Sequence, residues 1–110
     1  MKTGRKDLIA LLEERVLVCD GGMGTELYSR GVFINQCYDA LNLSRPTLVS
    51  DIHKSYVEAG VDIIETNTFA ANRFRLTPHG LGEELEAINI KGVELAREAA
   101  GEDVLVAGAM

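Results

Sequence analysis

The sequence predicts an α/β fold built around a parallel sheet. Three short runs rich in β-branched residues begin at Val16, Val61 and Val104, and each follows a stretch with helical spacing of apolar residues. Strands that alternate with helices in this way are typical of βαβ units. In such folds binding groups gather at the carboxyl ends of strands, and the first two runs end in polar residues.

Composition limits the classes of protein. The 110 residues are 46% apolar, which suits one small domain, and the net charge of −6 without a basic cluster argues against nucleic-acid binding. No apolar run approaches the roughly 18 residues that cross a membrane, and the run Leu8 to Leu12 is too short for a secretory signal. Two cysteines are too few for a disulfide framework, so we expect a cytoplasmic protein with no membrane partner.

The first predicted elements are a leading helix over residues 6–15 and a strand over residues 16–20. The strand is nearly all apolar, which is typical of burial on both faces, and we interpret Cys19 within it as a buried small residue. Three glycines follow within Gly21 to Gly24. They allow positive φ and a close approach of the backbone to a bound group.

Residues 31–44 show no period and predict a long loop, a feature that is often functional. The next helix is predicted with Ser44 as its N-cap, Pro46 in its first turn and Gly60 at its C-terminal end. The second strand begins at once, at Val61.

The last third of the chain is predicted to hold one long helix. Residues 68–76 are either a helical turn or a loop, and residues 83–100 are the helix, which ends before Gly101. Gly92 lies inside that helix at a cost of roughly 1 kcal/mol relative to alanine, which predicts close packing there. The third strand runs over residues 104–108.

Two groups of polar residues are candidates for binding. The carboxylate of Asp20 and the N–H groups of the adjacent glycines suit the ammonium and carboxylate of an amino acid, although Asp20 could instead bond within its own turn. Alternation places Glu65 and Asn67 on one face of the second strand and Thr66 and Thr68 on the other. These four polar residues either bind a ligand or simply form the solvent-exposed end of the strand.

The histidines and cysteines do not form a recognisable site in the sequence. His53 falls near the edge of an apolar helix stripe, which indicates a partly buried structural residue. Cys37 lies in the long loop and is expected to be accessible. Neither Cys19 nor Cys37 has a partner at metal-ligand spacing, so no metal ligand is assigned.

The segment Asp20-Gly21-Gly22-Met23-Gly24-Thr25-Glu26-Leu27 resembles the opening of the homocysteine S-methyltransferase (homocysteine-binding) family. The resemblance continues through Asp39-Ala40-Leu41-Asn42-Leu43-Ser44-Arg45-Pro46 and is strongest in Asp62-Ile63-Ile64-Glu65-Thr66-Asn67-Thr68-Phe69. It covers nearly all of the chain from Val16 onward. Within the family, the chain is most similar to the branch with cobalamin-dependent methionine synthase and the methylenetetrahydrofolate reductase fusions.

This resemblance implies the amino-terminal part of a (β/α)8 TIM barrel that transfers a methyl group to homocysteine and yields methionine. Residues 1–110 would then be a partial homocysteine-binding domain, with the leading helix over 6–15 and about three βα units over 16–110. The resemblance assigns Asp20, Gly21, Gly22, Glu65 and Asn67 to substrate binding, and Thr68 more weakly. A full barrel needs about 250 residues.

The family's cofactor cannot be assigned to these residues. The resemblance implies zinc held by three cysteine thiolates, but they belong to later Gly-x-Asn-Cys and Gly-Gly-Cys-Cys motifs that this sequence lacks. We therefore expect the isolated chain to be inactive. Methylfolate and methylcobalamin are candidate methyl donors.

Two other functions stay open. The chain could be a non-catalytic half-barrel that pairs with the missing carboxyl-terminal half, a second chain or itself, because a third strand with an open edge is a template for pairing. It could also be a small independent α/β domain with an unrelated ligand.

Overall fold

A computed structural model describes residues 8–33 and 35–109, so residues 6 and 7 of the predicted leading helix lie outside the described range. The described strands are β1 (Ile63–Glu65) and β2 (Leu105–Ala107), which pair in parallel. The helices are α2 (Leu8–Glu14), α3 (Met23–Ser29), α4 (Leu41–Ser44), α5 (Pro46–Glu58), α6 (Arg73–Leu76) and α7 (Leu85–Ala100), with short 3-10 helices η1 (Tyr38–Ala40), η2 (Thr77–His79) and η3 (Gly82–Glu84). The predicted α/β class is confirmed.

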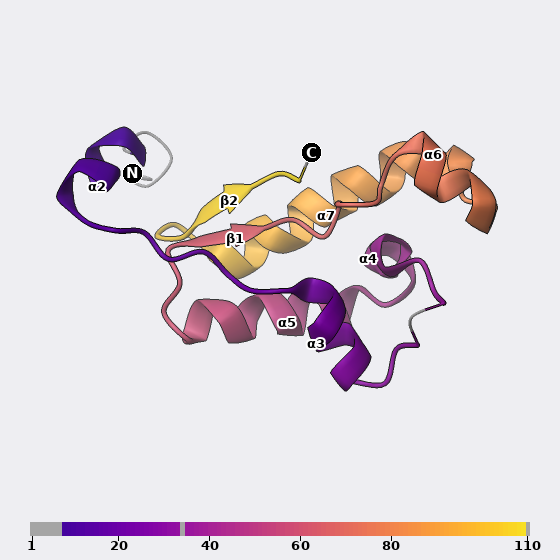
Figure 1. The fold of residues 1–110 in the computed structure, drawn as a ribbon, viewed down its shortest axis with the longest axis horizontal. Helices are drawn as coiled ribbons and strands as arrows, with labels where there is room; N and C mark the ends of the chain where they lie inside the picture. Colours follow the sequence, from indigo (N-terminus) through magenta and orange to yellow (C-terminus); the bar gives the residue numbers. More distant parts are fainter. Residues whose placement is uncertain (1–7, 34, 110) are drawn as a thin grey trace.

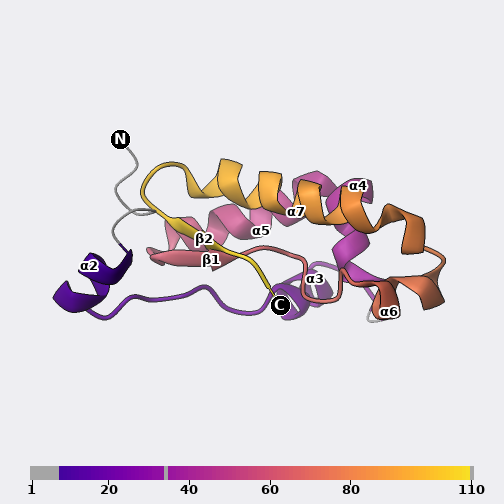
Figure 2. The ribbon, with the colours of Figure 1, turned by 90° about the horizontal axis from the view of Figure 1, so that it is seen from above.

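The two long helices, α5 and α7, lie on the same side of the strands (Figures 1 and 2). Ile64 of β1 is fully buried and packs against Ala96 and Ala100 of α7. A second apolar cluster joins α3, α4, α5 and α7 through Leu27, Leu41, Val49, Ile52 and Leu95. The core therefore lies between the helices and one face of the sheet, while Glu65 and Ala107 at the strand ends remain exposed.

The predicted strand over residues 16–20 is only partly formed. Cys19 makes a single parallel bridge to Ile63, and the backbone N–H of Asp20 donates to the Ile63 carbonyl at 2.9 Å. Val16 and Val18 are 85% and 55% exposed, and Cys19 is exposed too. The predicted burial of this segment, Cys19 included, is wrong. Backbone bonds to Asp62 and β1 hold the segment at its edge, but they do not cover the side chains of Val16, Val18 and Cys19.

The leading helix α2 stands at one end of the molecule, away from the helix layer (Figure 1). None of its residues is buried. The chain beyond α2 is tied to the sheet by Arg15, whose guanidinium lies 2.9 Å from the carboxylate of Asp62. The same carboxylate accepts a hydrogen bond from the N–H of Val18 at 2.8 Å.

The ends of α5 agree with the sequence in part. The helix begins at Pro46, and Gly60 follows it with φ of +100°, as predicted for a glycine at that end. Ser44 does not cap α5, because it is the last residue of α4 and its hydroxyl donates to the Ala40 carbonyl at 3.3 Å. The predicted loop over 31–44 therefore contains η1 and α4, which are too short to show a helical period.

The long helix over 83–100 is confirmed as η3 followed by α7. A Cβ atom at Gly92 would lie 2.7 Å from Cγ2 of Thr68 and 2.8 Å from Nδ2 of Asn42, which confirms the predicted close packing. The undecided segment 68–76 is a loop that leads into α6, and Asn72 caps this helix by accepting a bond from the N–H of Arg75. None of the helices in the described part of the chain combines the length and apolar character needed to cross a membrane.

Candidate functional site

A pocket of about 620 Å³ lies at the carboxyl end of β1, beside the glycine loop Gly21–Gly24. Its volume falls within the range of ligand sites. Five of the predicted site residues line it, namely Asp20, Gly21, Gly22, Glu65 and Asn67. The fold thus brings the ends of two separate chain segments to one pocket.

Asp20 and Glu65 are joined directly. The backbone N–H of Glu65 donates to Oδ2 of Asp20 at 3.1 Å. Burial raises the pKa of Asp20, and the nearby Glu65 carboxylate raises this pKa further, while the bond from the Glu65 N–H acts in the opposite direction. Two neighbouring carboxylates, one of them partly desolvated, favour a cationic ligand group such as an ammonium.

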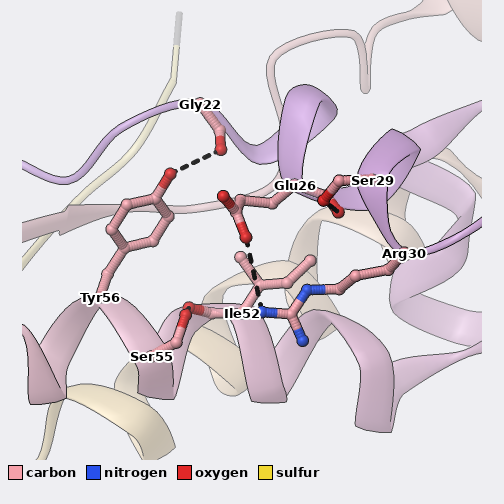
Figure 3. A network of polar contacts seen from close by, with 7 residues as sticks. All are labelled: Gly22, Glu26, Ser29, Arg30, Ile52, Ser55 and Tyr56. Carbon is pink, nitrogen blue, oxygen red and sulfur yellow. Dashed lines mark hydrogen bonds and ion pairs between the residues drawn. The ribbon is translucent and has the colours of Figure 1, made fainter.

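The glycine loop is held by two tyrosine rings. The phenol of Tyr56 donates to the Gly22 carbonyl at 2.8 Å (Figure 3). A Cβ at Gly21 would lie 2.8 Å from the same phenol oxygen. A Cβ at Gly24 would lie 3.3 Å from Cε2 of Tyr38. Gly21 and Gly24 thus lie close to the protein's own rings, and the close approach to a bound group stays a prediction.

The other reason proposed for these glycines was wrong. The described glycines with positive φ are Gly31, Gly60, Gly80 and Gly101, so the loop itself has ordinary backbone angles. Gly21 and Gly24 leave space for the two tyrosine rings, and Gly22 leaves space for the Thr25 hydroxyl, whose oxygen would lie 2.8 Å from a Cβ.

Tyr56 reaches the loop from α5. Opposite it lie Glu26 of α3 and Arg30, the residue after α3, whose side chains are 3.5 Å apart (Figure 3). Burial raises the pKa of Tyr56, and the charges of Glu26 and Asp20 raise it further. The phenol therefore keeps its proton at neutral pH and serves as a donor to the loop.

Asn67 and Thr68 occupy different places. Nδ2 of Asn67 donates to the Tyr38 carbonyl and to Oδ1 of Asn42, each at 3.0 Å, at the wall of the pocket. Thr68 does not line the pocket: its hydroxyl lies 2.6 Å from that of Thr66, on the shared face that alternation predicted, and its methyl group faces α7.

Several side chains of the pocket were not predicted from the sequence, and Asp39, Arg75 and His79 are among them. Asp39 is 5% exposed, and its Oδ2 accepts a bond from the N–H of Ala70 at 2.8 Å. Burial raises the pKa of Asp39, although the Ala70 bond and the charge of Arg75 act to lower it. The length of the loop over 31–44 and the family resemblance that begins at Asp39 both pointed to this stretch, but neither assigned Asp39 to the site.

The zinc implied by the resemblance does not fit these residues. The described residues contain no group of three or more His, Cys, Asp or Glu side chains placed to hold a metal ion. Cys37 is a free thiol at the pocket wall and is half-buried, less accessible than predicted. Cys19 is a free thiol on the exposed segment.

His53 is a structural residue, as predicted, but it is fully buried instead of partly buried. Neither ring nitrogen has a hydrogen-bond partner among the described residues. Burial lowers the pKa of His53 to about 4, so the ring is neutral at neutral pH.

Residues 17–110 match the family model for homocysteine S-methyltransferase. The chain belongs to this family. The family predicted from the motifs is therefore confirmed.

Two methionine synthases are among the relatives. The Mycobacterium tuberculosis protein is 36% identical over 102 residues, which are 87% of this chain and 9% of that protein. The Mycobacterium leprae protein is 35% identical over 102 residues, which are 87% of this chain and 8% of that protein. These matches agree with the predicted branch.

The fold is similar to that of the homocysteine methyltransferase MmuM from Escherichia coli. Its metallated form aligns with a TM-score of 0.77 and 32% identity over 92% of this chain. Its oxidised form aligns with a TM-score of 0.79 and 31% identity over 93% of this chain. In both cases the match spans 40% of the MmuM chain, so the present chain spans less than half the length of the relatives it matches.

Proposed function

We propose that this chain forms the part of a homocysteine S-methyltransferase that binds the amino acid end of homocysteine. In this proposal residues 1–110 are a partial (β/α)8 barrel domain, with the leading helix over 6–15 and about three βα units over 16–110. The family match and the likeness to MmuM support it. The exposed face of the sheet would then face the interior of the barrel.

The observation that carries the proposal is the 3.1 Å bond from the N–H of Glu65 to Asp20 at the pocket. The two carboxylates bind the ammonium group of homocysteine, and the backbone of Gly21 and Gly22 binds its carboxylate. Asn67 completes the wall, and Thr68 packs behind it.

In the parent enzyme, the sulfur of homocysteine gives up its thiol proton and forms a bond to the methyl carbon, while the bond between that carbon and the donor breaks, and the product is methionine. Methylfolate and methylcobalamin are the proposed methyl donors. The proposed location of the enzyme is the cytoplasm. Because this chain spans 40% of MmuM, we expect the purified 110-residue chain to show no methyl transfer with homocysteine, zinc and either donor. Methionine formation by that mixture would contradict this expectation.

The binding proposal is tested by calorimetric titration of the chain with L-homocysteine. Asp20→Asn keeps an oxygen that accepts the Glu65 N–H but removes the charge, so we expect about a tenfold or greater loss of affinity. Asp51→Asn, an exposed carboxylate on α5, is the matched control and should leave the affinity unchanged.

The ligand offers its own control. 4-Mercaptobutyric acid keeps the thiol and carboxylate of homocysteine but lacks the ammonium group. It should bind the wild-type chain weakly and should not distinguish wild type from Asp20→Asn. Equal affinity of the wild type for both compounds would contradict the proposal and would favour an unrelated ligand.

A second function, pairing with another chain, is favoured by the exposed segment 16–20. Val16 and Val18 are more than half exposed beside the single bridge at Cys19. Large apolar side chains next to a strand edge favour association with the rest of a barrel or with a second copy. Analytical ultracentrifugation tests self-association: a concentration-dependent dimer that is lost in Val16→Lys/Val18→Lys would support it, and a monomer at all concentrations would contradict it.

A further inference from the structure

One buried side chain, Asn42, connects three elements behind the pocket. Asn42 lies in α4 and is fully buried. Its Nδ2 donates to the backbone carbonyls of Asn67 at 2.9 Å and Ile88 at 3.1 Å, and its Oδ1 accepts the bond from Nδ2 of Asn67 at 3.0 Å. The single amide therefore links α4, the loop after β1 and α7.

The network defines the orientation of the Asn42 amide. In the reversed orientation, Oδ1 would face the two carbonyl oxygens and Nδ2 would face the donor group of Asn67. All three bonds would be lost together in a buried place. The Asn42 side chain thus has one arrangement that satisfies its neighbours, and this arrangement holds Asn67 by its backbone and its side chain at once.

Asn42 binds the chain just after the last backbone hydrogen bond between β1 and β2. The N–H of Thr66 still donates to the Ala107 carbonyl of β2 at 2.8 Å. One residue later, the carbonyl of Asn67 is bound by Asn42 instead. Because Glu65 lies two residues before Asn67, the Asn42 amide limits how far the end of β1 can move in the pocket.

Gly92 makes this contact possible. A Cβ there would lie 2.8 Å from Nδ2 of Asn42, so any larger residue would displace the amide that reaches the Ile88 carbonyl. The glycine inside α7 is thus explained by the space that the side chains of Asn42 and Thr68 need.

We propose that Asn42 is a positioning residue: it places Glu65 and Asn67 for homocysteine without touching the substrate. The inference rests on the proposed function because it concerns the same pocket. Asn42 does not line the pocket, so its effect on binding must pass through Asn67 and the end of β1.

The test compares Asn42→Ala with Asn89→Ala in the 110-residue chain. Asn89 is a matched control, because it is a part-buried asparagine of α7 whose Nδ2 donates at 3.0 Å to the Ala71 carbonyl of the same loop. We expect Asn42→Ala to weaken homocysteine binding about fivefold or more, the equivalent of one lost hydrogen bond, and Asn89→Ala to change it less than about twofold.

A second readout does not depend on the ligand. Hydrogen exchange at the Glu65 backbone amide, followed by NMR, should speed up in Asn42→Ala and stay near wild type in Asn89→Ala. If the wild type binds no homocysteine, the proposed function fails, yet this exchange still decides whether Asn42 orders the end of β1.

Three results would overturn the inference. The first is a folded Asn42→Ala chain with wild-type affinity for homocysteine, and the second is unchanged exchange at Glu65. The third is failure of both Asn42→Ala and Asn42→Ser to fold, because Asn42 would then be a core residue of the whole domain.

Discussion

The phenol of Tyr56 donates a hydrogen bond of 2.8 Å to the carbonyl oxygen of Gly22. This bond connects α5 to the loop that follows Asp20, and the same phenol leaves no room for a side chain at Gly21. The position of the loop is therefore set by a ring from a distant helix, which allows its role to be tested without changing a pocket residue.

Tyr56→Phe keeps the ring and removes the bond to Gly22. We expect the free energy of unfolding to fall by about 1 kcal/mol or less, since water can replace the lost donor at this exposed glycine, and homocysteine affinity to fall a few-fold. Urea denaturation and calorimetric titration measure the two effects. Ser55→Ala, which loses a bond of 2.8 Å to the Ile52 carbonyl within α5, should leave affinity unchanged.

Gly92→Ala tests the packing of α7 against the loop. The added methyl group improves helix propensity by about 1 kcal/mol, but it would lie 2.7 Å from Cγ2 of Thr68 and 2.8 Å from Nδ2 of Asn42. Overpacking of this kind typically costs about 1–3 kcal/mol, so we expect a net loss of stability in thermal or urea unfolding.

The double variant Gly92→Ala/Thr68→Ser checks this explanation. Serine removes Cγ2 but keeps the hydroxyl that faces Thr66, so part of the lost stability should return. An unchanged or increased stability of Gly92→Ala alone would show that the helix moves away at little cost.

His53 makes stability depend on pH. Its pKa is about 4 in the folded chain and about 6.5 when unfolded, so the unfolded chain binds the proton more readily. Stability is therefore lost as pH falls from about 6.5 toward 4, and His53 contributes about 3 kcal/mol to this loss.

The raised pKa values of Asp20 and Asp39 act in the opposite direction, because their carboxyls bind protons more readily in the folded chain. Comparing His53→Leu with the wild type isolates the histidine, and the variant should lose less stability between pH 7 and pH 4. His79→Gln, at an exposed position of η2, should follow the wild-type curve. Parallel curves for His53→Leu and the wild type would contradict the assignment.

Asp62 should hold the segment 16–20 against the sheet. Its carboxylate accepts the N–H of Val18, and this bond, together with Arg15, lowers the pKa of Asp62. The stability that Asp62 contributes is present above its pKa in the unfolded chain, near 4. It is lost as pH falls through the lower pKa of Asp62 in the folded chain.

In Asp62→Ala, hydrogen exchange at the Val18 amide should become faster at neutral pH while the amide of Leu105 in β2 stays protected. Asp103→Ala, an exposed carboxylate before β2, is the control. Equal exchange at Val18 in both variants would show that the bridge at Cys19 is enough to hold the segment.

The sequence predicted the elements whose signals are local. The apolar stripe of α5, the helix over 83–100 and the close packing at Gly92 could all be recognised, because periodicity and glycine placement report on each element by itself. The motifs around Asp20 and Glu65 also identified the family. The same local signals failed for η1 and α4, because these helices are too short to show a repeating apolar pattern. They also failed for Ser44, which ends α4 and does not cap the start of α5.

By itself the sequence determined the α/β class, the family and which polar residues end the strands, since these follow from patterns along one segment. The tertiary structure alone decided that Asp20 meets Glu65 and that Thr68 turns away from the pocket. It also decided that Asn42 holds Asn67 and that Cys19 is exposed. The physical reason is that a side chain's partner or exposure depends on how separate elements pack, and residues far apart in the chain carry no local signal of their meeting.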